Sequence, residues 1–392
     1  MVGAGPAGAA AAITAADRGL RVALVDKARF PRDKTCGDGL TAGALRRLEA
    51  LGLSLDRLPS YEQVRDVVLV APDGRQVVLP LPEGGHFAAV VPRAELDDAL
   101  IALARRRGID VREGAGVTGV ASDAGAVAVT LATGDEMSAP FVIAADGHFS
   151  TVRRLLRSGA DADLGTWHAF RQYYRGVADT RMWVLFEEDL LPGYAWVFPL
   201  PDGRANVGFG VLRGAGVDGK TLAARWRDLV DGPRLLAILG DGAEPEDARR
   251  AWPIPTRYEP DGLADGRVLF AGDAAAVVDP MTGEGIAQAI ETGALAVDAI
   301  AAGGAPGAVT GRYRRSVERA LGADLRFAGA LQRVLARPAG ARAALRAVDL
   351  SPWTRRNFAR WMFEDYPRAQ LLTPRRWRRR MLTGRGAYRN VA

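Results

Sequence analysis

Short apolar runs alternate with helical segments of small residues, and this alternation predicts strand–turn–helix units. The segment AAAAITAADRG (9–19) is typical of a helix, and LRVALVD (20–26) follows it as a short apolar strand. The same strand–turn–helix order recurs in FVIAADGHFSTVRRLL (141–156) and in GRVLFAGDAAAVVDPMTGEGIAQAIETGALA (266–296). We therefore expect an α/β fold of the Rossmann type around a largely parallel sheet.

A different, period-two pattern occupies the middle of the chain. In PGYAWVFPLPDGRANVGFGV (192–211) two alternating runs flank the turn LPDGR, which predicts a pair of antiparallel strands. Tyr194, Trp196 and Phe198 then share one strand face and form a flat apolar wall, followed by Pro199. The alternative is an ordinary core face of an antiparallel sheet. The segment DVVLVAPDGRQVVLPLP (66–82) predicts a hairpin in the same sheet.

These patterns divide the chain into three parts. We expect a discontinuous nucleotide-binding domain (1–60, 93–160 and 262–305), a substrate domain with an antiparallel sheet (61–92 and 161–261) and a C-terminal helical region (306–392). At 392 residues the chain is long enough for such a division.

Composition narrows the class of protein. Cys36 is the single cysteine and the three histidines are scattered, so no intramolecular disulfide and no metal-ligand spacing is expected. No signal peptide and no apolar run long enough to span a membrane is present, which favours a cytoplasmic protein. We expect His148 to be a surface residue and Asp38 to be a simple loop acid.

The glycines near the start of the chain form the G-x-G-x-x-G fingerprint of dinucleotide-binding βαβ units. In such a unit the glycines allow a tight turn, close approach of the backbone to a pyrophosphate, and close helix–strand packing. The helix N-terminus offers N–H groups to the phosphates. Asp26, 18 residues after Gly8, is placed to accept hydrogen bonds from a ribose. The expected cofactor-binding residues of this unit are Gly3, Gly5, Pro6, Ala7, Gly8, Asp26 and Lys27.

Only Met1 and Val2 precede this fingerprint, whereas a strand normally runs about five or six residues. The first strand is central in this fold, so losing most of it would leave the sheet poorly paired. We therefore expect the true gene to start further upstream. An apolar strand encoded in frame upstream would support this expectation, and an immediate stop codon would contradict it.

The three glycine-containing units together resemble the FAD-binding set of the p-hydroxybenzoate hydroxylase fold. The resemblance implies that Asp273 holds the ribityl chain and that the turn Gly283-Glu284-Gly285-Ile286 lies beside the flavin pyrimidine. A helix N-terminus at that place suits the negative charge of a reduced flavin; the alternative for Glu284 is a residue favoured only by the helix start. The resemblance extends to VPRAELDDALIALARRRG (91–108) and adds these cofactor-binding residues: Arg93, Asp146 and Gly272.

Two further motifs resemble the geranylgeranyl reductase family, closest to its bacterial menaquinone reductase branch. They are Cys36-Gly37 within DKTCGDGLT (33–41) and Tyr194-x-Trp196-x-Phe198-Pro199. The resemblance implies that Cys36 and Gly37 contact the flavin and that the aromatic strand binds substrate. Cys36 and Tyr194 are candidate proton donors, although a single cysteine is more often a small buried hydrophobe.

The implied activity is FAD-dependent reduction of C=C bonds in an isoprenoid chain, on menaquinone or on a geranylgeranyl group. NAD(P)H or a ferredoxin-like carrier would supply the electrons. An FAD-dependent monooxygenase or halogenase acting on an aromatic or polyketide substrate is the alternative, because the same FAD motifs and the same aromatic wall would serve it. A non-catalytic flavin-binding accessory protein is a third interpretation.

Charge is concentrated at the C-terminus. Residues 353–392 carry eleven arginines and two acidic residues, a formal charge of +9, so the remainder of this +6 chain sums to −3. Aromatic residues are interleaved there: Trp353, Phe358, Trp361, Phe363 and Trp377. We expect peripheral binding to an anionic membrane on its cytoplasmic face. The alternative is a helical cap with inward-packed aromatics; no nucleic-acid recognition motif is present.

Overall fold

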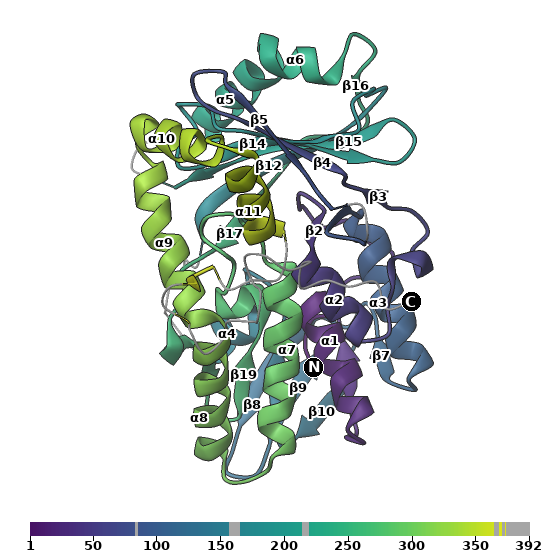
Figure 1. The fold of residues 1–392 in the computed structure, drawn as a ribbon. Helices are drawn as coiled ribbons and strands as arrows, with labels where there is room; N and C mark the ends of the chain where they lie inside the picture. Colours follow the sequence, from purple (N-terminus) through teal and green to yellow (C-terminus); the bar gives the residue numbers. More distant parts are fainter. Residues whose placement is uncertain (83–84, 157–164, 214–218, 364–367, 371–372, 374–392) are drawn as a thin grey trace.

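In the computed structural model the described residues are 1–82, 85–156, 165–213, 219–363, 368–370 and 373. A parallel sheet with its helices forms one half of the molecule, and a large, mainly antiparallel sheet forms the other (Figure 1). Helices of the C-terminal region run along one side of both. The expected α/β fold with an antiparallel sheet and C-terminal helices is confirmed.

The first residues of the chain lie at the centre of the parallel sheet. Val2 bridges Val25 on one side and Ala144 on the other, both in parallel. Its N–H donates to the carbonyl of Ile143 at 2.9 Å, and the N–H of Gly3 donates to the carbonyl of Val25 at 2.8 Å. Even this short segment therefore pairs on both sides. The sheet order is β7 (Asp110–Arg112), β1 (Ala23–Val25), residues 1–3, β11 (Val142–Ala144), β19 (Val268–Phe270) and the antiparallel β18 (Ala264–Asp265).

Small residues bring the helices of this half close together. At Gly293 a Cβ would lie 2.3 Å from the carbonyl oxygen of Ala7, so only glycine permits this approach of α7 to α1. These helices lie in front of the sheet in Figure 1, and a three-stranded meander lies behind it. The helices in front are α1 (Pro6–Asp17), α2 (Ala42–Ala50), α3 (Arg93–Arg106) and α7 (Ile286–Ala301). The meander is β8 (Val117–Ser122), β9 (Val127–Leu131) and β10 (Glu136–Ala139), and the short α4 (Thr151–Leu156) packs against β8.

The second half is an eight-stranded sheet with two different faces. Ala195 and Val197 point to one face, where α5 and α6 pack with Trp226 in a buried cluster. The opposite face turns toward the first half. The strands are β16 (Glu244–Pro245), β12 (Gly165–Arg175), β15 (Arg204–Leu212), β14 (Tyr194–Leu200), β13 (Met182–Leu185), β4 (Asp66–Val70) and β5 (Gln76–Pro80), with β17 (Arg250–Pro255) on β12; the helices are α5 (Gly219–Val230) and α6 (Pro233–Leu239).

Two strand pairings predicted from the sequence are confirmed. β14 and β15 pair antiparallel across the turn at 201–203, and β4 and β5 form the hairpin expected at 66–82. A small sheet connects the two halves at the loop that follows β1. It consists of β2 (Gly39–Thr41), β6 (Ala88–Val90) and β3 (Glu62–Gln63).

The C-terminal region is helical, as expected, up to Phe363. A π-helical turn at Glu318–Gly322 joins the first two helices, and the last helix lies in front of the large sheet in Figure 1. The helices are α8 (Pro306–Val317), α9 (Ala323–Leu335), α10 (Pro338–Val348) and α11 (Pro352–Phe363). Within the described part of the chain, no helix has the length and apolarity needed to cross a membrane.

Candidate active site

A cavity of about 510 Å³ lies between the two halves. Sequence segments far apart in the chain meet there: the glycine loop, the 32–41 loop, the aromatic face of β14 and the start of α7. All but two of the predicted site residues line it: Gly3, Gly5, Pro6, Ala7, Asp26, Lys27, Cys36, Gly37, Arg93, Asp146, Tyr194, Trp196, Phe198, Gly272, Asp273, Gly283, Glu284, Gly285 and Ile286.

The two exceptions have clear geometric reasons. Gly8 packs beneath the loop, where a Cβ would lie 1.8 Å from the carbonyl oxygen of Gly3. Pro199 is buried, but strand alternation directs it to the sheet face of Ala195 and Val197, away from the cavity. The structure therefore places Pro199 on the face opposite the cavity, and its contact with substrate stays a prediction.

The glycine loop fits the pyrophosphate of a dinucleotide. A Cβ at Gly5 would meet no protein atom nearer than 3.7 Å, so its surface is open for close approach of a ligand. No side chain caps α1 at Gly5, which leaves its N-terminal N–H groups directed at that space. Asp26 orders the loop, because its carboxylate accepts the N–H of Ala4 at 2.6 Å and that of Ala28 at 2.7 Å.

Two guanidinium groups face the same open surface. The nearest atoms to a Cβ at Gly5 are Nη2 of Arg32 at 3.7 Å and Nη2 of Arg93 at 3.9 Å. Asp97, which is fully buried, binds both: Arg93 through bonds of 2.9 and 2.7 Å, and Arg32 at 2.9 Å. Burial alone would lower the pKa of Arg93, but the charge of Asp97 raises it overall. Asp97 therefore holds both guanidinium groups where a diphosphate would lie.

The start of α7 supplies a second, uncapped helix N-terminus. Gly285 is its N-cap and no side chain bonds to the first turn. Gly283 adopts a left-handed conformation (φ +70°), which glycine accommodates without strain. Glu284 lies at the same turn, where it accepts a hydrogen bond from the hydroxyl of Thr41, and burial raises its pKa. Asp273 lines the cavity beside this turn, so the residues present fit an FAD along the whole cavity.

The predicted aromatic wall is present. Tyr194, Trp196 and Phe198 lie in a row on β14, with ring centroids 6.0 and 5.9 Å apart. A Cβ at Gly37 or Gly39 would lie 3.3 Å from Cε2 of Phe198, so the 37–39 backbone rests directly against this wall.

The two candidate proton donors are both poor acids. Burial raises the pKa of the Cys36 thiol, and burial also raises that of the Tyr194 hydroxyl. The hydroxyl of Tyr194 also donates to the carbonyl of Thr282. Cys36 is partly buried, and its carbonyl accepts a hydrogen bond from Nδ2 of Asn206 at 2.8 Å. The structure gives both residues a fixed place in the cavity.

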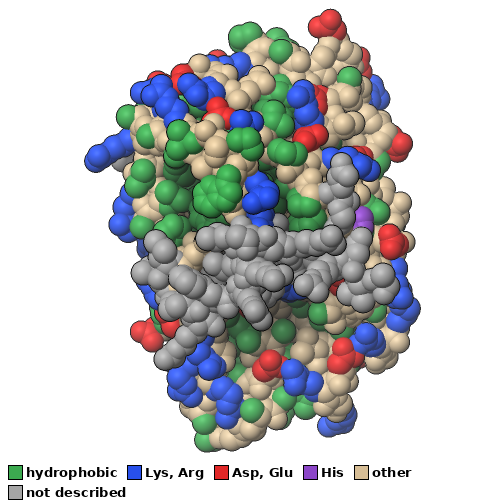
Figure 2. Space-filling view, in the orientation of Figure 1, with side chains coloured by type: hydrophobic (Ala, Val, Ile, Leu, Met, Phe, Trp, Pro, Cys, Tyr) green, Lys and Arg blue, Asp and Glu red, His purple; other side chains and the backbone are tan. Residues whose placement is uncertain are grey.

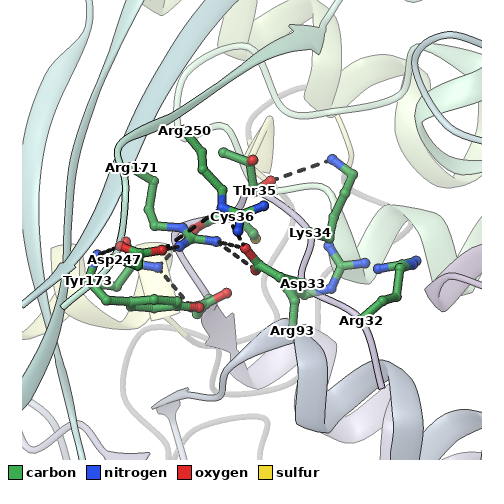
Figure 3. Close-up of polar contacts among 12 residues, drawn as sticks. Arg32, Asp33, Lys34, Thr35, Cys36, Arg93, Arg171, Tyr173, Asp247 and Arg250 are labelled. Carbon is green, nitrogen blue, oxygen red and sulfur yellow. Dashed lines mark hydrogen bonds and ion pairs between the residues drawn. The ribbon is translucent and has the colours of Figure 1, made fainter. Parts of the chain in front are cut away.

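Sequence reasoning missed a buried ion-pair network beside the cavity. Arg171, which is fully buried on β12, binds Asp33 at 2.6 Å and Asp247 at 2.9 Å. Arg250 also reaches Asp33, at 3.2 Å. Figure 3 shows Asp33 between these arginines, at the start of the loop that continues to Cys36. The network thereby ties the 32–36 loop to the large sheet, and its members are far apart in the sequence.

Asp38 is the most important correction to the sequence analysis. It is not a simple loop acid: it is fully buried, lines the cavity and has a left-handed backbone (φ +63°). Its Oδ2 accepts the hydroxyl of Tyr173 at 2.6 Å and Nδ2 of Asn206 at 2.8 Å. Burial raises its pKa to about 6, although these two hydrogen bonds act in the opposite direction.

Two other residues differ from expectation or were missed. His148 is buried rather than on the surface, while its neighbour Phe149 is 57% exposed and packs against Trp252.

Lys34 holds its ammonium 4.2 Å from the centre of the Trp252 ring. Burial lowers the pKa of Lys34, and the charge of Asp273 partly offsets that effect.

Comparison with known proteins agrees with this geometry. The FAD-binding domain family matches residues 1–305. The chain is 36% identical over 329 residues to a menaquinone reductase of Mycolicibacterium smegmatis, covering 78% of this chain and 76% of that protein. It is 30% identical over 317 residues to a digeranylgeranylglycerophospholipid reductase of Methanosarcina mazei, covering 76% of this chain and 74% of that protein.

A solved structure shares the fold throughout. The geranylgeranyl bacteriochlorophyll reductase-like protein of Thermoplasma acidophilum aligns with a TM-score of 0.80 at 23% identity, over 96% of this chain and 98% of that one. The chain belongs to the FAD-binding domain family and, within it, to the geranylgeranyl reductase group of flavoproteins.

Proposed function

We propose that this protein reduces C=C bonds in the isoprenoid side chain of menaquinone, with a geranylgeranyl chain on a lipid as the second choice of substrate. One observation carries the proposal: the cavity that fits FAD continues without a partition onto the wall of Tyr194, Trp196 and Phe198. Similarity to a menaquinone reductase over most of both chains supports the substrate.

When bound, FAD supplies a hydride to one carbon of the double bond. The protein's task is placement, because an isolated alkene is a poor hydride acceptor. The aromatic wall binds the prenyl chain by apolar contact and excludes water from it. Arg32, Arg93 and the start of α1 would hold the diphosphate of the cofactor, and the uncapped start of α7 would stabilise negative charge on the flavin.

The electrons must come from outside the chain. We propose NAD(P)H or a ferredoxin-like carrier as the donor. Anaerobic mixing of the FAD-loaded protein with NADH, with NADPH or with a reduced ferredoxin distinguishes these donors by the rate at which flavin absorbance bleaches. Bleaching by none of the three would contradict this part of the proposal.

We also propose that the protein binds an anionic membrane from its cytoplasmic side, where its substrate resides. Leu350 and Trp353 at the α10–α11 corner are 77% and 55% exposed, and basic side chains lie among apolar ones on this face (Figure 2). However, Phe358 and Phe363 pack against the core, and the indole of Trp361 donates to the carbonyl of Arg368, as the alternative of an inward-packed cap predicts.

The basic segment from Pro374 onward, with Trp377, lies outside the described residues. Sedimentation with neutral and with anionic vesicles tests the membrane proposal. Binding that increases with anionic lipid and falls with salt supports it. Equal sedimentation with both kinds of vesicle would show that electrostatic attraction does not contribute to membrane binding.

Mass spectrometry of lipid quinones, in cells with and without the gene, tests the main proposal. Loss of the gene should shift menaquinone to a mass lower by two hydrogens, because one side-chain double bond stays unreduced. An unchanged quinone profile would direct attention to a geranylgeranyl lipid. An oxygenated or halogenated product of the purified protein would instead support the monooxygenase or halogenase alternative.

A further inference from the structure

The proposed reaction needs a proton as well as a hydride, and the buried Asp38 is placed to hold it. Adding H₂ across a double bond requires a proton at the second carbon once the first has received a hydride. Cys36 and Tyr194 hold their protons too tightly, since burial raises the pKa of both. Carboxyl groups are intrinsically stronger acids than a thiol or a phenol, and several of them line the cavity.

Most of those carboxyl groups already have other tasks. Asp26 is bonded to backbone N–H groups at the nucleotide end, and Asp33 is paired with Arg171 and Arg250. Glu284 accepts a hydrogen bond from Thr41 and lies 3.7 Å from Arg368, which favours its ionised form. It remains the rival candidate, because burial also raises its pKa.

Asp38 combines an uncommitted carboxylate oxygen with a place at the aromatic wall. Tyr173 and Asn206 both bond to Oδ2, whereas Oδ1 is buried and has no hydrogen-bond partner among the described residues. Oδ1 of Asp146 is also buried without a partner among the described residues, but Asp146 lies beside Gly3 at the nucleotide end of the cavity. A buried carboxylate oxygen without a donor is costly, and a protonated carboxyl removes that cost. Burial accordingly raises the pKa of Asp38 to about 6.

The charged and titratable neighbours of Asp38 come from three directions. Tyr173 and Arg171 face it from β12, Arg93 from α3, and Cys36 from its own loop. The two arginines favour the ionised form, so the carboxylate left after proton loss is stabilised as well. A group whose two protonation states are both tolerated near neutral pH can release and regain a proton during turnover.

The position of Asp38 matches that task. It lies between Gly37 and Gly39, whose backbone rests on the ring of Phe198. Asn206 binds Asp38 through Nδ2 and accepts the indole N–H of Trp196 through Oδ1 at 2.9 Å, so the acid is fixed relative to the aromatic wall.

We propose that Asp38 is the acid that protonates the substrate carbon opposite the one that receives the hydride. This inference rests on the proposed function. The O–H bond of the carboxyl breaks and a C–H bond forms with the electron pair of the double bond. The alkene gains one hydride and one proton, and the carboxylate then recovers a proton from water.

The pH dependence of kcat for Asp38→Asn tests the proposal, with the FAD-loaded protein at saturating substrate. Asn tolerates the left-handed backbone, and its amide oxygen can accept both hydrogen bonds that Oδ2 of Asp38 accepts, so folding should be preserved. The wild type should lose kcat tenfold per pH unit above about pH 6. The variant should fall by about 100-fold or more and lose this limb. Asp202→Asn is the matched control: it has the same φ of 63° on an exposed turn and should behave as wild type.

A second readout is independent of turnover. In the cofactor-free chain, infrared spectroscopy should show the C=O band of a protonated carboxyl that titrates near pH 6 and is absent from Asp38→Asn. Loss of the pH limb in Glu284→Gln instead of Asp38→Asn would overturn the assignment, as would a normal kcat profile in Asp38→Asn. If the wild type itself reduces no isoprenoid, the proposed function fails and the acid assignment fails with it, whatever the infrared band shows.

Discussion

The substitution Asp38→Asn, which removes a titrating carboxyl group, should change how the stability of the protein depends on pH. The pKa of this carboxyl is 3.8 in the unfolded chain and about 6 in the folded one, because the side chain is fully buried. A raised folded pKa means that the folded state binds the proton more tightly. The stabilisation is complete below pH 3.8 and is lost as pH rises through about 6.

The size of the effect follows from the shift. Each pKa unit corresponds to about 1.4 kcal/mol, so a shift of roughly two units amounts to about 3 kcal/mol. The Asn side chain of Asp38→Asn resembles the neutral carboxyl at every pH. The substitution therefore removes the pH-dependent contribution of residue 38 to the free energy of unfolding. Relative to wild type, the free energy of unfolding of the variant should therefore rise by about 3 kcal/mol between pH 3 and pH 8.

Equilibrium denaturation of the cofactor-free chain at a series of pH values measures this difference. All other titrating groups are shared, so subtracting the two curves isolates the contribution of residue 38. Asp202→Asn, on an exposed turn with the same φ, should give a curve parallel to wild type. A curve for Asp38→Asn that also runs parallel to wild type would refute the reasoning, because it would mean that the carboxyl is ionised in the folded protein.

Three further substitutions test the other parts of the site. Gly8→Ala should abolish FAD retention, measured as flavin absorbance per protein, because its Cβ would lie 1.8 Å from the carbonyl oxygen of Gly3; a yellow variant would contradict this. Asp97→Ala leaves the buried Arg93 unpaired and should cost about 3–5 kcal/mol in urea denaturation, whereas a loss below 1 kcal/mol would show that the pair is not needed. Trp196→Phe removes the hydrogen bond from the indole N–H to Asn206 and should raise KM for the prenyl substrate about tenfold with flavin content unchanged. An unchanged KM would show that this part of the aromatic wall does not contribute to substrate binding.

Local patterns predicted the parts of the site that depend on backbone conformation. The glycine loop, the turn at 283–286 and the alternation of Tyr194, Trp196 and Phe198 are all local patterns, so each part could be predicted from the sequence. In the structure these parts line one cavity. Pro199 belongs to the same motif but does not line the cavity, because strand alternation directs adjacent residues to opposite faces.

Burial and long-range pairing were not predictable in the same way. Asp38 looked like a loop acid because its partners, Tyr173 and Asn206, lie on strands more than a hundred residues away. Arg171 shows the same problem: a lone arginine in a strand pattern gives no sign that Asp33 and Asp247 will surround it. One local signal does mark Asp38: it lies between Gly37 and Gly39, two residues after Cys36, within the glycine-rich motif at 33–41.

Anaerobic turnover of the purified, FAD-loaded protein tests the central claim most directly. The flavin is reduced chemically, menaquinone is added, and the product is analysed by mass spectrometry together with the return of flavin absorbance. The account predicts reoxidation of the flavin and a product heavier by two hydrogens in the side chain, without oxygen. A flavin that stays reduced until oxygen is admitted, with menaquinone unchanged, would contradict it.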